Sequence, residues 1–243
     1  FKDVKISFKK GLLSIVVDEN PIIGNINIEG LKSKKLKNAI KDNLLLKERS
    51  SYNEIVLNND LEGVYETLRN LGFYFPKVEI SIKEQSDNII DITFNIETGN
   101  KTKISKINFT GNKYFKKNKL KSVIISEEYK PWKFISGRKY LKKNNVDFDK
   151  KLLKNFYLNN GFYDVEINSS FAKLNKDDDF ELVFNIIENK KYYFDNLTLN
   201  LPSNYNTNNY SEILNLFSKL RNKPYSITRI EKIINEIDKI STN

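Results

Sequence analysis

Apolar and polar residues alternate in several short stretches of this 243-residue chain. Residues 25–29 show the two-residue period of a half-buried strand, with isoleucine at every second position. The same period returns in residues 78–82 and 90–96, and Asp87-Asn88 between them has the composition of a turn. We therefore expect one strand at the first stretch and a β-hairpin over the other two.

Two helical patterns lie between that first strand and the hairpin. Apolar residues recur three and four positions apart within residues 36–44, and the same spacing continues for longer within residues 57–71. Gly72 follows, at a position where a helix end commonly needs a left-handed residue. The order of elements is thus β-α-α-β-β.

This unit occurs a second time in the chain. Residues 26–30 return as 107–111, residues 71–74 as 160–163, and residues 94–97, more loosely, as 184–187. The three offsets are 81, 89 and 90 residues, and the order of the landmarks is kept. Three matches in the same order predict a tandem repeat with one insertion in the second copy.

The second copy supports the same order of elements. We expect strands at 107–109, 165–171 and 180–186, a first helix around Leu120, and a second helix marked by Phe148, Leu152, Phe156 and Tyr157. The inserted stretch contains Pro131-Trp132-Lys133-Phe134. We expect an enlarged loop there, with these aromatic residues as its anchor.

The predicted fold class is α+β, with tandem β-α-α-β-β units that each form a three-stranded mixed sheet covered on one face by two helices. Residues 21–99 and 100–189 are predicted complete units. Residues 1–20 are predicted to be the closing hairpin of a preceding unit, and residues 190–243 a truncated unit with a first strand at Leu197–Leu201, two helices and no closing hairpin. The predicted hinges between units are Thr98, Gly99, Asn100, Asn189 and Lys190.

The order of elements also predicts which strands are exposed. A crossover through two helices makes the first and last strands of a unit parallel neighbours, so the remaining strand lies at the sheet edge with unpaired backbone groups. These edge strands are candidate partner-binding sites. Their residues are Val78, Glu79, Ile80, Ser81, Ile82, Val165, Glu166, Ile167, Asn168, Ser169, Ser170 and Phe171.

Composition excludes several kinds of chemistry. The chain has no Cys and no His, so it cannot form a disulfide, a Ser-His-Asp triad or a zinc site held by His or Cys. It also has no Met, so we expect a fragment or a processed chain. The net charge of +10 leaves a nucleic-acid-binding repeat protein as an alternative, although only five of the 41 basic residues are arginine.

Local clusters of charge favour structural roles. Asp177–Asp179 lacks the glycine and the distal glutamate of a calcium loop, so we expect a solvated hairpin turn there. The densest basic cluster is Lys116, Lys117, Lys119 and Lys121, where a solvated helix face is favoured over a contact with anionic lipid. No carboxylate suited to catalysis recurs between the two units in this interpretation. A carboxylate-based hydrolase on the same fold is the remaining enzymatic alternative.

The repeated unit resembles POTRA domains. Leu71-Gly72-Phe73-Tyr74 at the end of a second helix is similar to the POTRA pattern, as is the long run from Phe148 to Val165 with its Gly161-Phe162-Tyr163. The resemblance covers essentially the whole chain, and residues 1–20, 21–99, 100–189 and 190–243 would correspond to parts of four successive domains. The aromatic residues after each helix-ending glycine are expected to pack the helix against the sheet.

The resemblance implies a function without catalysis. It implies a periplasmic scaffold at the outer membrane, part of a β-barrel assembly machine, which binds unfolded outer-membrane proteins and lipoprotein subunits of the assembly complex by β-augmentation. It also implies that the full-length protein is anchored by its own C-terminal membrane β-barrel. No cofactor, metal or nucleic acid is expected. The POTRA region of a related translocation or assembly protein, such as TamA, is the alternative within the superfamily.

Overall fold

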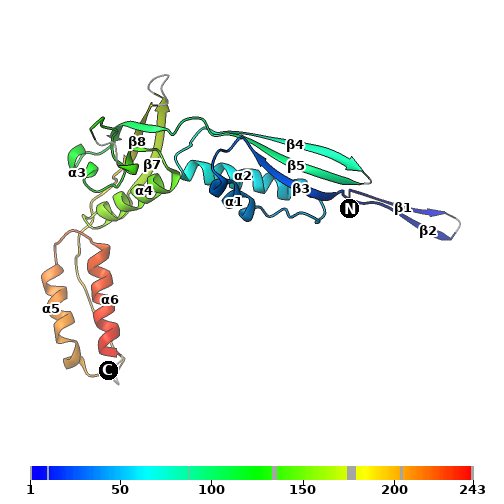
Figure 1. Cartoon of the computed structure of the whole chain (residues 1–243). Helices are drawn as coiled ribbons and strands as arrows, with labels where there is room; N and C mark the ends of the chain where they lie inside the picture. Colours follow the sequence, from blue (N-terminus) through cyan, green and yellow to red (C-terminus); the bar gives the residue numbers. More distant parts are fainter. Residues whose placement is uncertain are drawn as a thin grey trace. The chain divides into compact units, whose positions relative to one another are not determined.

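The computed structural model describes residues 2–9, 11–86, 88–132, 136–173, 179–202 and 205–241. They divide into two compact units, Phe1–Thr102 with Leu141–Lys143, and Lys103–Tyr140 with Asn144–Asn243. Each unit contains one three-stranded mixed sheet (Figure 1). The predicted fold class is therefore confirmed, whereas the predicted domain boundaries stay predictions.

The sheet of the first unit has the strand order β3-β5-β4. β3 (Ile22–Glu29) runs parallel to β5 (Ile89–Glu97), and β4 (Lys77–Ser86) pairs with β5 antiparallel. The helices α1 (Lys34–Asn43) and α2 (Glu54–Asn70), with three leucines of the adjoining loops, supply the rest of the core. Every second residue of β5 is buried, because its two faces differ as the alternation predicts.

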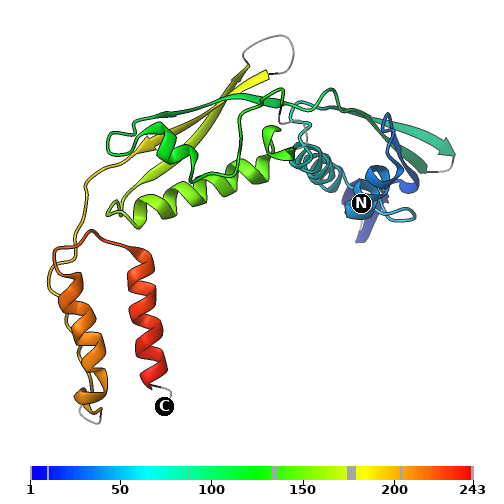
Figure 2. The same cartoon turned by 60° about the vertical axis from the view of Figure 1, so that its left-hand side comes forward.

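The second unit repeats this arrangement with the order β6-β8-β7. β6 (Lys103–Thr110) is parallel to β8 (Asp179–Ile187), and β7 (Glu166–Lys173) is antiparallel to it. Figure 2 shows α4 (Lys143–Leu158) lying along one face of this sheet. The expected first helix is short, since α3 spans only Lys117–Lys121 and is followed by the 3-10 helix η1 (Gly137–Lys139).

The second helix of each unit ends at its predicted glycine. Gly72 has a φ of +95° and Gly161 a φ of +101°, the left-handed conformation that glycine adopts at no steric cost. The amide of Phe73 donates to the carbonyl of Leu68 at 3.0 Å, and that of Phe162 to Tyr157 at 3.0 Å. This six-residue closure is a Schellman motif in both copies.

The N-terminal hairpin forms as predicted. β1 (Asp3–Lys9) and β2 (Leu12–Asp18) are antiparallel. Val4 pairs with Val17 and Ile6 with Ile15. All of these side chains are exposed, so this hairpin presents an apolar face without helices of its own.

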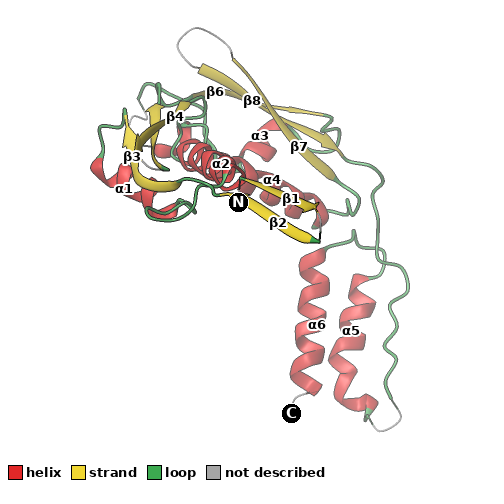
Figure 3. Cartoon of the chain, turned by 90° about the vertical axis from the view of Figure 1, so that its right-hand side faces the viewer, coloured by secondary structure: helices red, strands yellow, loops and turns green. Residues whose placement is uncertain are grey.

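The C-terminal part differs from expectation in one element. Figure 3 shows the two expected helices, α5 (Ser211–Leu220) and α6 (Ile227–Ser241), with η2 (Thr207–Tyr210) before them. The predicted strand at Leu197–Leu201 is wrong, because these residues have no strand conformation. In both complete sheets this position pairs with the last strand of its unit, and the described residues after 190 include no such strand. Leu199 and Leu201 pack instead against a small core of Tyr210, Ile213 and Ile233.

Two details of the second unit also refine or correct the sequence interpretation. Phe148 is 49% exposed, and the core face of α4 is formed by Val146, Leu153 and Tyr157. Trp132 is 72% exposed and so does not anchor its loop; Lys133 and Phe134 lie outside the described residues. Of the predicted acidic turn only Asp179 is described, as the first residue of β8.

Candidate strand-docking edges

β4 and β7 lie at the edges of their sheets, as the sequence predicts. Among the described residues, each pairs with one strand, the central β5 or β8. Six of the seven predicted binding residues of the second unit lie on β7, and the seventh, Val165, is buried just before it. The five of the first unit lie on β4. That a partner binds these residues stays a prediction.

The register shows which backbone groups of β7 point outward. The amide of Ile107 points out of the opposite edge, because it donates to the Glu128 side chain at 2.9 Å. Backbone groups alternate along each strand, and Ile107 is paired with Leu182, which is paired in turn with Phe171. The outward residues of β7 are therefore Ile167, Ser169 and Phe171, and the residues between them face β8.

The opposite edge of each sheet is covered by the chain itself. In the first unit the amide of Ile23 donates to Ser50 at 2.9 Å, and the carbonyl of Ile23 accepts from Arg49 at 2.7 Å. In the second unit the carbonyl of Ile104 accepts from Tyr129 at 2.6 Å. These loop contacts occupy backbone groups that an added strand would need.

A carboxylate completes this cover at the same place in both units. Glu48 accepts the amide of Ile26 at 3.3 Å and is bridged by Lys41 at 2.8 Å. Glu128 accepts the amide of Ile107, and Lys121 bridges it at 2.6 Å. Charged side chains on an edge are a known means of preventing strand addition. We call Glu48 and Glu128 the edge-closing glutamates.

The edge-closing glutamates are held ionised by these contacts. The hydrogen bond from Lys41, with the amide of Ile26, lowers the pKa of Glu48 below its ordinary value. Burial acts to raise the pKa of Glu128, but the bonds from Lys121 and Ile107 outweigh it, so that its pKa is also lowered. Both side chains therefore remain acceptors at neutral pH.

A second pair of carboxylates also recurs. Asp60 on α2 accepts the amides of Leu45 at 2.6 Å and Leu46 at 2.9 Å. Asp149 on α4 accepts the amide of Ile125 at 2.7 Å and lies in the same position of its unit. Burial raises the pKa of Asp149. Carboxylates therefore recur between the two units, and the recurring ones fix loops and edges.

A groove lies beside β7, on the side of the sheet that carries α4. It has a volume of about 410 Å³ and is lined by Asp147, Lys150, Lys151, Lys154 and Ile167. Ile167 is paired with Ile186, whose side chain is buried in the core, so Ile167 also faces the helix. An added strand would thus have alternate side chains over this groove.

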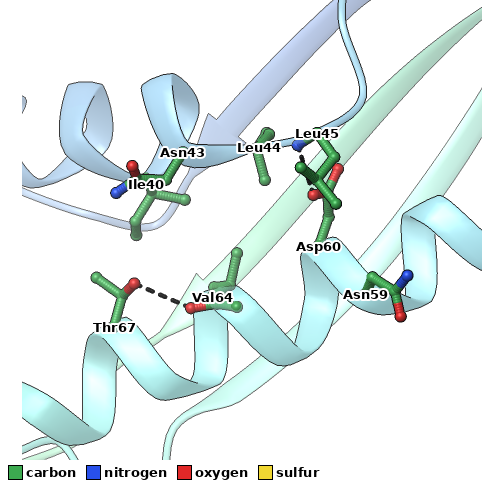
Figure 4. A pocket seen from close by; sticks show the side chains of 9 residues that line it. Ile40, Asn43, Leu44, Leu45, Asn59, Asp60, Val64 and Thr67 are labelled. Carbon is green, nitrogen blue, oxygen red and sulfur yellow. Dashed lines mark hydrogen bonds between the residues drawn. The ribbon is translucent and has the colours of Figure 1, made fainter.

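A smaller cavity of about 260 Å³ lies between α1 and α2 (Figure 4). Ile40, Leu44 and Val64 give it apolar walls. Its one carboxylate belongs to Asp60, whose two oxygens are engaged by backbone amides. The cavity therefore holds a structural carboxylate rather than a pair of groups arranged for acid-base chemistry.

The aromatic residues after the helix-ending glycines have different roles. Phe162 is fully buried and Phe73 packs against the core, as predicted. Tyr74 is half-buried. Tyr163 is 57% exposed and instead contacts the rings of Tyr192 and Tyr225, at 6.2 and 5.3 Å between centroids.

The predicted hinge residues include one left-handed residue in each linker. Gly99 has a φ of +62° and Asn189 a φ of +53°. Asn189 also donates through its side chain to the carbonyl of Asp164 at 2.6 Å. Hinge motion at Thr98, Asn100, Lys190 and these two residues stays a prediction.

Sequence reasoning missed a contact that follows each linker. The carbonyl of Gly72 accepts the amide of Thr102 at 2.9 Å, and that of Gly161 accepts Tyr192 at 2.7 Å. The helix-ending glycine therefore also fixes the chain that enters the next unit. The recurrence of the glycine was visible in the sequence, but its bonding partner was not.

Three of the four lysines of the basic cluster are engaged within the fold. Lys121 bridges Glu128, Lys117 donates to the side chain of Asn108, and Lys119 lies 5.6 Å from the ring centre of Phe156. Within the described residues there is no group of three or more acidic side chains placed to hold a metal ion. No described helix is long and apolar enough to cross a membrane.

Comparison with known proteins assigns the repeated unit. The family model for POTRA, described as "surface antigen variable number repeat", matches residues 21–99 and 102–189. The outer membrane protein assembly factor BamA of Buchnera aphidicola is 26% identical over 242 residues, which are 98% of this chain and 38% of that protein. BamA of Neisseria meningitidis is 29% identical over 181 residues, 73% of this chain and 22% of that protein.

A solved structure agrees with this assignment at the level of the fold. The POTRA3-5 fragment of Haemophilus influenzae BamA matches with a TM-score of 0.52 and 10% identity, covering 91% of this chain and 86% of that one. This chain spans less than two fifths of the two assembly factors named above. With its family model matched over two units and its sheets built in the same order, the chain belongs to the POTRA family.

Proposed function

We propose that this chain is a periplasmic scaffold of an outer-membrane β-barrel assembly machine. It binds unfolded outer-membrane proteins and accessory lipoproteins by β-augmentation on β4 and β7, and it performs no chemical step. The support is its membership of the POTRA family and its similarity to relatives named as outer membrane protein assembly factors. The full-length protein would be held at the periplasmic face of the outer membrane by a C-terminal barrel.

The observation that carries this proposal is the asymmetry of each sheet. One edge is covered by loop contacts and an edge-closing glutamate, whereas β4 or β7 forms the other edge with a single neighbour. An added strand bonds mainly to backbone groups, so its affinity depends little on its side chains. This property suits a scaffold that must receive many different unfolded β-strands.

Ser169 and Ser170 allow a matched test of strand addition. Proline removes one backbone amide, and the two serines differ in which way that amide points. Ser169→Pro removes an outward donor, so we expect melting close to that of the native chain and a loss of affinity for an extended peptide from an outer-membrane protein. Ser170→Pro removes a donor that faces β8, and we expect a loss of stability of roughly 0.5–1.5 kcal/mol plus ring strain.

Peptide affinity is measured by fluorescence anisotropy and stability by thermal unfolding followed by circular dichroism. The two variants carry the same substitution at neighbouring positions of β7, so Ser170→Pro controls for the ring itself. If Ser169→Pro folds normally and binds the peptide as tightly as the native chain does, docking at the edge of β7 is wrong.

A further inference from the structure

The groove beside β7 carries a stripe of positive charge. Asp147, Lys150, Lys151 and Lys154 follow one another at the spacing of one helix face, and all four line the groove. Lys150 bridges Asp147 at 2.8 Å. Lys151 and Lys154 are exposed and have no ion pair within the described part of the chain. Among the described residues, these two cations beside the edge strand have no counter-ion.

The first unit lacks this stripe. Asp60 and Asp149 occupy the same place in their helices, since both accept loop amides and lie 89 residues apart. The same offset places Asn58, Leu61, Glu62 and Tyr65 where the groove has its acidic residue and three lysines. The two units therefore share the structural carboxylate and differ in the side chains at the positions that line the groove. The lysines of the groove are thus not a feature of the repeated fold itself.

We propose that the groove beside β7 selects extended segments that carry acidic side chains at alternate positions. This rests on the proposed function, because the segment must add to β7 before its side chains reach α4. Alternate residues of a strand lie about 6.6–6.8 Å apart, and lysines one helical turn apart have Cβ atoms about 5–6 Å apart. Two carboxylates on the helix-facing side therefore match Lys151 and Lys154, while Ile167 contacts the apolar parts of the segment.

The experiment compares two peptides on the whole chain. One is an alternating Thr/Val peptide with glutamate at two alternate positions, and the other has glutamine there. We expect the glutamate peptide to bind about three- to tenfold more tightly at low ionic strength, as two exposed ion pairs would give, and this preference to fade at high salt. The double variant Lys151→Gln/Lys154→Gln should remove the preference and leave binding of the glutamine peptide unchanged.

Lys34→Gln/Lys35→Gln is the matched control, because it removes the same charge from exposed positions on α1. This control should keep the preference. Equal binding of both peptides to the native chain would overturn charge selection while leaving strand addition intact. Preference that survives the groove variant, or that the control variant also loses, would overturn the assignment to this groove. Failure of both peptides to bind would instead count against the proposed function.

Discussion

Removing the edge-closing glutamate of the second unit should loosen the edge of β6. Glu128 accepts the amide of Ile107 at 2.9 Å and bridges Lys121 at 2.6 Å, with 26% of its side chain exposed. A hydrogen bond to a charged group contributes about 1.5–3 kcal/mol, and a partly exposed ion pair about 0.2–1 kcal/mol. Because water can reach this edge and replace the acceptor, we expect Glu128→Ala to cost about 1–2 kcal/mol.

Glu128→Gln separates the two contributions. Glutamine keeps an oxygen that accepts the amide of Ile107 and loses only the charge opposite Lys121. We expect it to cost about 0.5 kcal/mol, so that stability decreases from the native chain to the glutamine variant and then to the alanine variant. Urea unfolding measures this order, and native-state hydrogen exchange at Ile107 locates it.

The pH dependence of stability gives an independent check that the ionised Glu128 side chain stabilises the folded chain. The pKa of Glu128 is lower in the folded chain than its ordinary value, so the folded state favours the ionised form. Its stabilisation is fully present above the unfolded pKa, which is about 4.3, and is lost as the pH falls through the folded pKa. The native chain should therefore lose more stability on acidification than Glu128→Ala does.

Glu48→Ala serves as the control, because it makes the same change in the other unit and should leave exchange at Ile107 unaffected. The alanine variant at Glu128 should also self-associate at high concentration, since an uncovered edge can pair with another chain. Sedimentation velocity measures this association. Unchanged exchange at Ile107 in Glu128→Ala would refute the reasoning that the carboxylate closes this edge.

Two further predictions concern the cores of the units. Gly30→Ala should destabilise the first unit by about 2 kcal/mol or more, because the residue has a φ of +81° and a Cβ would lie 2.2 Å from the carbonyl oxygen of Ile96. Gly63→Ala should instead stabilise this unit by about 0.5–1 kcal/mol, because a Cβ there meets nothing within 4 Å in the middle of α2. Urea unfolding of both variants would contradict this if the changes had the same sign. Tyr157→Phe should cost about 1.5–3 kcal/mol, since the buried Tyr157 hydroxyl donates to Glu188 at 2.9 Å and burial with this bond raises the pKa of Tyr157. Tyr114→Phe, at an exposed ring, should melt as the native chain does, and equal melting of both variants would count against the bond.

Local periodicity was enough to predict most strands and their partners. The alternation in residues 90–96 gives β5 its buried face, and β1 and β2 form the expected hairpin. In β5 the buried face of the strand decides its register. The apolar sequence at Leu197–Leu201 has the same period but forms no strand, because a strand also needs a neighbour for its backbone groups.

The core face of α4 does not follow from its apolar residues alone, because a polar residue occupies a core position. Asp149 is fully buried and Phe148 is exposed, so a core face assigned from apolar residues alone is displaced by about one residue. The carboxylate is tolerated there because it accepts loop amides. Matching Asp149 to Asp60 in the repeat would have revealed this role from the sequence alone, as would matching Glu128 to Glu48 at an offset of 80 residues.

The two units of this chain can be compared residue by residue. They share the groups that determine how a sheet is closed, namely the edge-closing glutamates and the glycine carbonyls that receive the next segment. They differ in the side chains beside the open edges, where Glu62 in one unit corresponds to Lys151 in the other. Groups that maintain the fold are constrained in every copy, whereas groups that contact a partner need only suit that partner. If strands add to both edges as proposed, this difference predicts that β4 and β7 receive different segments, with backbone pairing common to both and charge deciding between them.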